Sequence, residues 1–131
     1  MPSHSIDING TRVFVLDSDG PQLRSGVDAV DTMSAASEFQ STFIAIPVER
    51  LGDDFFNLST RVAGDIIQKF ATYGRQVAVF GDISERISSS KSLAAFVIES
   101  NRGKDLWFLK DIQTLAERLS SEAESHHDPA E

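Results

Sequence analysis

Two hydroxyl side chains stand where a helix is expected to begin, a position at which a hydroxyl can carry a regulatory phosphate. Ser59 and Thr60 follow an expected strand and precede a run with helical apolar spacing. The first N–H groups of a helix have no partner within it, and the helix dipole favours negative charge there. The pattern therefore predicts a phosphorylation site at Thr60 or Ser59. The alternative is plain capping of the helix by Asn57, Ser59 or Thr60.

A second set of polar residues follows the next buried strand. Asp82 and Ser84 lie just past residues 76–80, at the edge where open α/β sheets commonly bind ligands. Together with Asn57 and Thr60 from the preceding connection, they form a candidate small-ligand site. Turn formation in the serine-rich loop explains Asp82 and Ser84 about as well.

The segment Asp17-Ser18-Asp19-Gly20, directly after Val13–Leu16, resembles the first motif of the haloacid-dehalogenase phosphatases. The resemblance implies a strand that delivers two carboxylates to one magnesium ion. Asp17 would attack phosphorus and Asp19 would act as acid and base, while magnesium offsets the charge repulsion. The likeness covers eight residues, and no convincing lysine motif follows. A plain Asp-Ser-Asp-Gly-Pro turn is the competing interpretation.

The amino-acid composition excludes several kinds of catalytic and metal-binding site. The chain of 131 residues has no cysteine, which excludes disulfides, thiolate zinc ligands and a thiol nucleophile. His126 and His127 lie in the C-terminal tail and are interpreted as solvated, so we expect no metal site, and we expect no cofactor. The sequence predicts no convincing catalytic constellation, which favours a non-enzymatic domain.

The net charge and the hydropathy of the chain argue against nucleic acid and membranes as partners. A net charge of −8 repels a phosphate backbone, and the basic residues are scattered, so no nucleic-acid partner is expected. No signal peptide and no bilayer-spanning stretch is recognised, which predicts a cytoplasmic protein without membrane association. A protein partner or a kinase remains as an expected partner, and a homodimer is left open.

Apolar periodicity and turn residues predict the elements that position these side chains. Asn9-Gly10 joins two strands, because a type I′ turn needs positive φ at both central residues. The first helix has Leu23, Val27, Val30 and Met33 as its apolar stripe. Strands are predicted at 6–8, 11–16, 42–47, 76–80 and 106–109, and helices at 22–39, from about 60 to 73, around 93–100 before Gly103, and at 112–119 after an Asp111 N-cap.

The order ββαβαβαβα predicts an α/β fold with a small mixed β-sheet, in which an N-terminal hairpin precedes alternating strands and helices. Residues 1–120 are interpreted as a single α/β domain. Residues 121–131 are acidic and lack an apolar stripe, so they are expected to form a disordered tail.

Several longer motifs resemble an uncharacterised bacterial domain-of-unknown-function family, number four-one-eight-zero. The similarity lies in residues 55–70 and 77–82, in Ser90–Leu93, and in the Glu99–Gly103 motif that precedes the Trp107-Phe108 strand. At Ser59 the family often has a basic residue and at Arg61 a glycine, which leaves Thr60 the better candidate. The resemblance marks Asn101, Arg102 and Gly103 as structural, and we predict a left-handed helix cap at Gly103 or Asn101 with Arg102 near the last carbonyls.

The element order is similar to that of the sulfate-transporter/anti-sigma-antagonist domain, a mixed sheet in which a partner kinase phosphorylates a Ser or Thr where a helix follows a strand. This topological likeness implies a regulatory or protein-interaction module. The alternatives are a small-ligand module at the strand ends and the magnesium-dependent phosphotransfer enzyme of Asp17 and Asp19.

Overall fold

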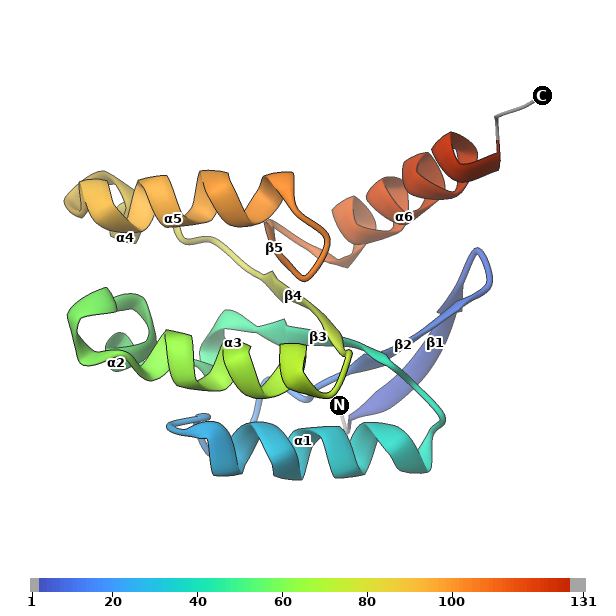
Figure 1. Cartoon of the computed structure of the whole chain (residues 1–131), viewed down its shortest axis with the longest axis horizontal. Coiled ribbons are helices and arrows are strands. Elements are labelled where there is room, and N and C mark those ends of the chain that lie inside the picture. The colour runs from blue at the N-terminus through green and yellow to red at the C-terminus, as the bar shows by residue number, and fades with distance from the viewer. Residues whose placement is uncertain (1–2, 128–131) are drawn as a thin grey trace.

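The computed structural model describes residues 3–127, with side chains described up to residue 121. Its centre is a mixed sheet in the order β1-β2-β3-β4-β5 (Figure 1). β1 is antiparallel to β2, and the remaining neighbours are parallel. This confirms the predicted α/β class, with its opening hairpin and alternating elements. The strands are β1(His4–Ile8), β2(Thr11–Val15), β3(Phe43–Pro47), β4(Gln76–Phe80) and β5(Leu106–Leu109).

The hairpin turn has the predicted geometry. Asn9 and Gly10 have φ values of 51° and 88°, and Ile8 pairs with Thr11 across the turn. Positive φ at both central residues is the type I′ conformation, whose twist matches that of the flanking strands. The local sequence therefore sets the register of β1 on β2.

Three helices form one layer on the front of the sheet, defined here as the face that Phe14 and Ile44 line (Figure 1). They are α1(Gly26–Glu38), α3(Val62–Thr72) and α5(Lys91–Arg102), and all three contribute to a single apolar cluster with that face. Consecutive parallel strands are neighbours here, and crossovers of one hand place every connecting helix on the same side.

The other face of the sheet packs against α6(Ile112–His127). Leu115 is fully buried among the residues of this second cluster, which includes Val13, Phe43 and Trp107. The Asp111 carboxylate accepts the Thr114 N–H at 2.8 Å and so caps α6. α6 continues to His127 and so runs into the segment predicted to be a tail; residues 128–131 lie outside the described residues.

The first helix was predicted wrongly at its beginning and on its buried face. α1 starts at Gly26, and Leu23 instead forms a bridge with Leu51. Val27 is 69% exposed, whereas Ala29 is fully buried. A distant residue also holds the first turn, because Asp65 of α3 accepts the Gly26 N–H at 2.7 Å. That contact has no signal in the local sequence.

Four short helical segments in the connections were not predicted. They are η1(Val48–Arg50), α2(Asp53–Phe56), η2(Leu58–Thr60) and α4(Ser84–Ser89). Segments of three to six residues are too short to show a helical apolar period, so pattern analysis treats them as loops. All four follow β3 or β4 and so lie toward the carboxyl edge of the sheet.

The predicted left-handed cap at the end of α5 is wrong. Gly103 has φ −92° and ψ −163°, an extended conformation, and Asn101 is a helical residue of α5. The last carbonyls are bound by Arg118 of α6, whose Nη2 donates to the Asn101 carbonyl at 2.5 Å. Arg102 pairs instead with Glu99, at 3.8 Å. The physical reason is that a basic side chain from another helix already satisfies the carbonyls that a left-handed turn would satisfy.

Replacing Gly103 with alanine is expected to leave stability within about 0.5 kcal/mol of wild type. The backbone at Gly103 lies in a region open to any residue, and an added Cβ would meet only the Ser100 carbonyl, at 3.6 Å. Urea denaturation followed by the fluorescence of Trp107 measures the change. A loss of more than about 1 kcal/mol would show that the glycine is needed after all.

Candidate functional site

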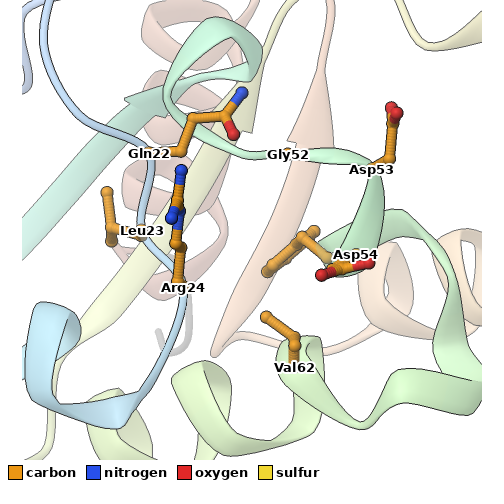
Figure 2. A pocket seen from close by; sticks show the side chains of 8 residues that line it. Gln22, Leu23, Arg24, Gly52, Asp53, Asp54 and Val62 are labelled. Carbon is orange, nitrogen blue, oxygen red and sulfur yellow. The ribbon is translucent and has the colours of Figure 1, made fainter.

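Three connections meet at the carboxyl edge of the parallel strands and enclose two clefts. The first cleft, of about 300 Å³, lies between the connection after β2 and the helices α2 and α3 (Figure 2). The second cleft, of about 340 Å³, lies between α2 and the segment that holds α4 and the start of α5. Asp53 lines both clefts, so α2 forms the wall between them.

The first cleft carries opposite charges on opposite walls. Figure 2 shows Gln22 and Arg24 on the connection after β2 and Asp53 and Asp54 across from them on α2, with Val62 of α3 below. Within the described part of the chain, the side chains of Arg24 and Asp54 have no hydrogen bond or ion pair. Both charges are therefore available to a bound molecule.

The second cleft is bridged by one arginine. Arg86 of α4 donates from Nη2 to Asp53 Oδ1 at 3.0 Å, and its guanidinium lies 4.5 Å from the centroid of the Phe56 ring. The Asp53 side chain is 93% exposed, so the ion pair adds little stability. Its consequence is geometric: it links α4 to α2 across the cleft.

The loop that supplies Gln22 and Arg24 is held by an arginine from the neighbouring connection. Arg50 donates from Nε to the Pro21 carbonyl at 2.6 Å and from Nη1 to the Asp17 carbonyl at 2.7 Å. Gly20 has φ 141°, and an added Cβ there would lie 3.0 Å from the Arg50 guanidinium carbon. The lack of a side chain at Gly20 therefore lets Arg50 reach the loop backbone.

Thr60 and Ser59 are both exposed, and both hydroxyls make local hydrogen bonds. Thr60 Oγ1 lies 2.6 Å from the Asp54 carbonyl oxygen and 2.8 Å from that of Asn57, and it accepts the Val62 N–H at 3.2 Å. Ser59 Oγ donates to Asn57 Oδ1 at 2.7 Å. The Thr60 hydroxyl thus joins α2 to the first residue of α3.

Thr60 lies just before α3 and not within its first turn, where it was predicted. It ends η2, and Arg61 follows with φ 67° before α3 begins. Glycine adopts a left-handed conformation without strain, whereas Arg61 adopts it here at some cost. The turn at Arg61 separates the two helical segments and leaves Thr60 at the surface.

Asp82 and Ser84 form a local cap. Asp82 Oδ1 accepts the Ser84 hydroxyl at 2.6 Å and the Ser84 N–H at 3.0 Å. These two hydrogen bonds, that of the hydroxyl first, hold the pKa of Asp82 below its ordinary value. Of the four residues predicted to share a ligand site, only Asn57 lines either cleft.

Asp17 and Asp19 adopt a tight turn. The Asp17 carboxylate accepts the Asp19 N–H at 3.1 Å, and the Asp17 N–H donates to the Ser3 hydroxyl at 2.8 Å. In the part of the chain that the structure describes, no group of three or more His, Asp or Glu side chains is placed to hold a metal ion. Nor is any helix there long and apolar enough to cross a membrane.

Sequence analysis missed three residues that line the clefts: Gln22, Arg24 and Arg86. The first two were assigned to the first helix, and Arg86 was assigned to a loop. A usable signal existed for the first pair, because Ser25 followed three residues later by Asp28 is typical of a helix beginning after Ser25. In the structure Asp28 accepts the Arg24 N–H at 2.7 Å. Arg86 has no comparable signal.

Comparison with protein families places most of the chain in one group. Residues 8–119 match the model of a domain of unknown function (DUF4180). No curated protein and no solved structure matches the chain. The matched range includes every residue of both clefts.

Proposed function

The chain belongs to this family of unknown function, DUF4180, and we propose that it is a non-enzymatic regulatory module that binds a protein partner at the carboxyl edge of its sheet. One observation carries the proposal: α2 forms the common wall of two neighbouring clefts, and its position depends on an exposed threonine hydroxyl. The first cleft exposes mainly charged and polar groups. Small-molecule pockets are mostly apolar, so the lining favours a protein surface as the ligand.

Phosphorylation of Thr60 would alter this surface. The Thr60 hydroxyl faces the carbonyl oxygens of Asp54 and Asn57, and a phosphate ester can no longer donate to them. Its negative charge would also repel the nearby carboxylates of Asp53 and Asp54, although the α3 N-terminus would attract it. We expect the repulsion by the carboxylates and the attraction by the α3 N-terminus together to displace α2 without unfolding the sheet. A displacement of α2 changes both clefts, because α2 forms the wall between them.

The element order is similar to that of the anti-sigma-antagonist domain, a mixed sheet in which a partner kinase phosphorylates a Ser or Thr where a helix follows a strand. That likeness concerns only the order of the elements, and it supports a regulatory role by analogy, beside the support from the two clefts. A kinase acting on Thr60, or less readily on Ser59, would be the regulator.

Removing the Thr60 hydroxyl is expected to destabilise the domain by about 1 kcal/mol, the usual cost of a lost helix cap. In Thr60→Ala the Val62 N–H loses its acceptor, and the tie to the Asp54 carbonyl disappears. Thr60→Ser keeps the hydroxyl and is the matched control. Urea denaturation of both variants measures the effect, and equal stability of the alanine and serine variants would contradict the cap.

Partner binding is tested with two charge reversals of equal size. Arg86→Glu alters the second cleft and breaks the pair with Asp53, while Arg102→Glu breaks the pair with Glu99 at the far end of α5. The wild type, both charge-reversal variants and Thr60→Glu are immobilised and exposed to extract from cells that express the protein, and bound proteins are quantified. We expect a partner that Arg86→Glu and Thr60→Glu lose and that Arg102→Glu retains. Equal capture by all four proteins would refute the proposed surface.

A small polar ligand in the first cleft is the second candidate function, favoured by the opposed charges of Arg24 and Asp54. A zwitterion such as an amino acid carries one anionic and one cationic group, which complement the charges of Arg24 and Asp54. A ligand at a hundred times its dissociation constant adds about 2.7 kcal/mol of stability, which a thermal-shift screen detects. Arg24→Gln should abolish the shift, and the absence of any stabilising amino acid would remove this candidate.

A further inference from the structure

A third cavity lies at the opposite edge of the sheet from the two clefts. It has a volume of about 210 Å³ and lies between the C-terminal half of α1 and the turn that joins α3 to β4. Because that turn enters β4 at its first residue, the cavity is at the amino edge of the parallel strands. It is lined by Val30, Met33, Ser34, Ser37, Tyr73 and Arg75.

The charge of Arg75 is incompletely satisfied. Its Nη1 donates to the Tyr73 carbonyl at 3.1 Å, and its Nε is buried without a hydrogen-bond acceptor. No other buried side-chain nitrogen or oxygen lacks a partner within the described residues. Nor does any carboxylate of that part of the chain pair with Arg75, although the protein carries a net charge of −8. An orphaned donor on a charged group is costly, and its occurrence calls for a physical explanation.

Besides Arg75, the cavity is lined by apolar side chains and by side chains with hydroxyl groups. Met33 is buried, Val30 is partly buried, and the Tyr73 side chain is 56% exposed, which is unusual for a large apolar residue. Ser34 and Ser37 add hydroxyls, which donate or accept as the ligand requires. An apolar hollow with a few convergent polar groups is the usual form of a small-molecule site.

We propose that this cavity binds a compact organic acid, with its carboxylate on the Arg75 guanidinium and a short branched or cyclic apolar body against Val30, Met33 and Tyr73. The carboxylate supplies the counter-ion that Arg75 lacks, through charge-assisted hydrogen bonds. The volume holds roughly seven water molecules at ~30 Å³ each, which limits the ligand to a small acid. This site is separate from the proposed partner surface and does not depend on it.

The test is an amide-resolved NMR titration with 4-methylpentanoate as the probe. We expect shifts confined to the second half of α1 and residues 73–75, with a dissociation constant on the order of 1 mM. The neutral isostere 4-methylpentanamide should bind at least about tenfold more weakly, because it lacks the charge that pairs with Arg75. Inorganic phosphate should also bind more weakly, since it has charge but no apolar body.

Three variants test whether the acid binds in this cavity. Arg75→Gln should weaken binding of the acid at least about tenfold, and Ser34→Leu should block it by filling the cavity while Arg75 stays in place. Arg12→Gln removes a different arginine, one that pairs with Asp7, and should bind like wild type. The spectrum of each variant without ligand reports whether it is folded. Equal binding of acid and amide, unchanged binding by the folded Arg75→Gln variant, or no localised shifts would each overturn the proposal.

Discussion

Replacing Gly81 with alanine is expected to destabilise the domain by about 4 kcal/mol, a large part of the stability of a domain of this size. Gly81 has φ 140°, a conformation that L side chains rarely adopt, and an added Cβ would lie 2.4 Å from Cγ2 of Val48. Strain of this kind costs about 1–3 kcal/mol, and overpacking adds a similar amount. The measurement is urea denaturation followed by the buried Trp107.

Two further substitutions separate backbone strain from steric overlap at this position. Gly10→Ala also places a side chain at positive φ, but no atom lies within 4 Å of the new Cβ, so a loss of about 1 kcal/mol is expected. In the double variant Gly81→Ala/Val48→Ala the overlap is reduced, and the two substitutions should be less than additive. Full additivity, or a Gly81→Ala effect no larger than that of Gly10→Ala, would refute the close approach.

The approach of Gly81 to Val48 also bears on function. Val48 is the first residue after β3 and Gly81 the first after β4, so their contact sets how close the two connections come. These connections carry α2 and α4, the two walls of the second cleft. A Gly81→Ala protein that remains folded should therefore lose the partner that Arg86→Glu loses.

Replacing Asn101 with alanine is expected to cost about 3 kcal/mol. The Asn101 side chain imitates a neighbouring strand: its Oδ1 accepts the Phe108 N–H at 2.7 Å, and its Nδ2 donates to the Phe108 carbonyl at 3.3 Å. Phe108 lies on β5, an edge strand, and is 7% exposed. Alanine would leave two buried backbone groups without partners, at about 1–3 kcal/mol each.

The control is Gln76→Ala, which removes an exposed amide that donates to the Lys104 carbonyl at 3.0 Å. We expect its loss to stay within about 0.5 kcal/mol. Asn101→Asp is informative as well, because its carboxylate still accepts the Phe108 N–H but is repelled by the Phe108 carbonyl. If Asn101→Ala lowered the free energy of unfolding no more than Gln76→Ala does, the hydrogen bonds of Asn101 to the edge strand β5 would not contribute the expected stability.

At Asn101, the local conformation inferred from the motif differs from the one observed. The sequence marked the Asn101-Arg102-Gly103 motif as structural, but the expected left-handed cap is absent. The cap was inferred from neighbours along the chain, whereas the actual partners, Phe108 and Arg118, come from β5 and α6. Arg118 also stacks on Trp107, with its guanidinium 4.0 Å from the ring centroid. Contacts of this kind depend on how the elements pack and not on local propensity.

The sequence by itself determined the elements whose causes are local. Continuous apolar runs mark the three central strands, Asn9-Gly10 enforces the hairpin, and Gly74 ends α3 with φ 68°. Alternation of strands and helices then implies the mixed sheet, because parallel neighbours need crossover helices.

Only the tertiary structure decided the sites. Asp65 holds the first turn of α1 against α3, Arg50 holds the loop after β2, and Thr60 and Arg86 hold the wall between the clefts. Most of these contacts join residues far apart in sequence, with side chains that local pattern analysis assigns to solvated surface. Hydrophobic periodicity records which face is buried, but it carries no information about which polar groups meet once the faces are packed. For that reason the fold could be predicted from the sequence, whereas the clefts and the cavity at Arg75 could not.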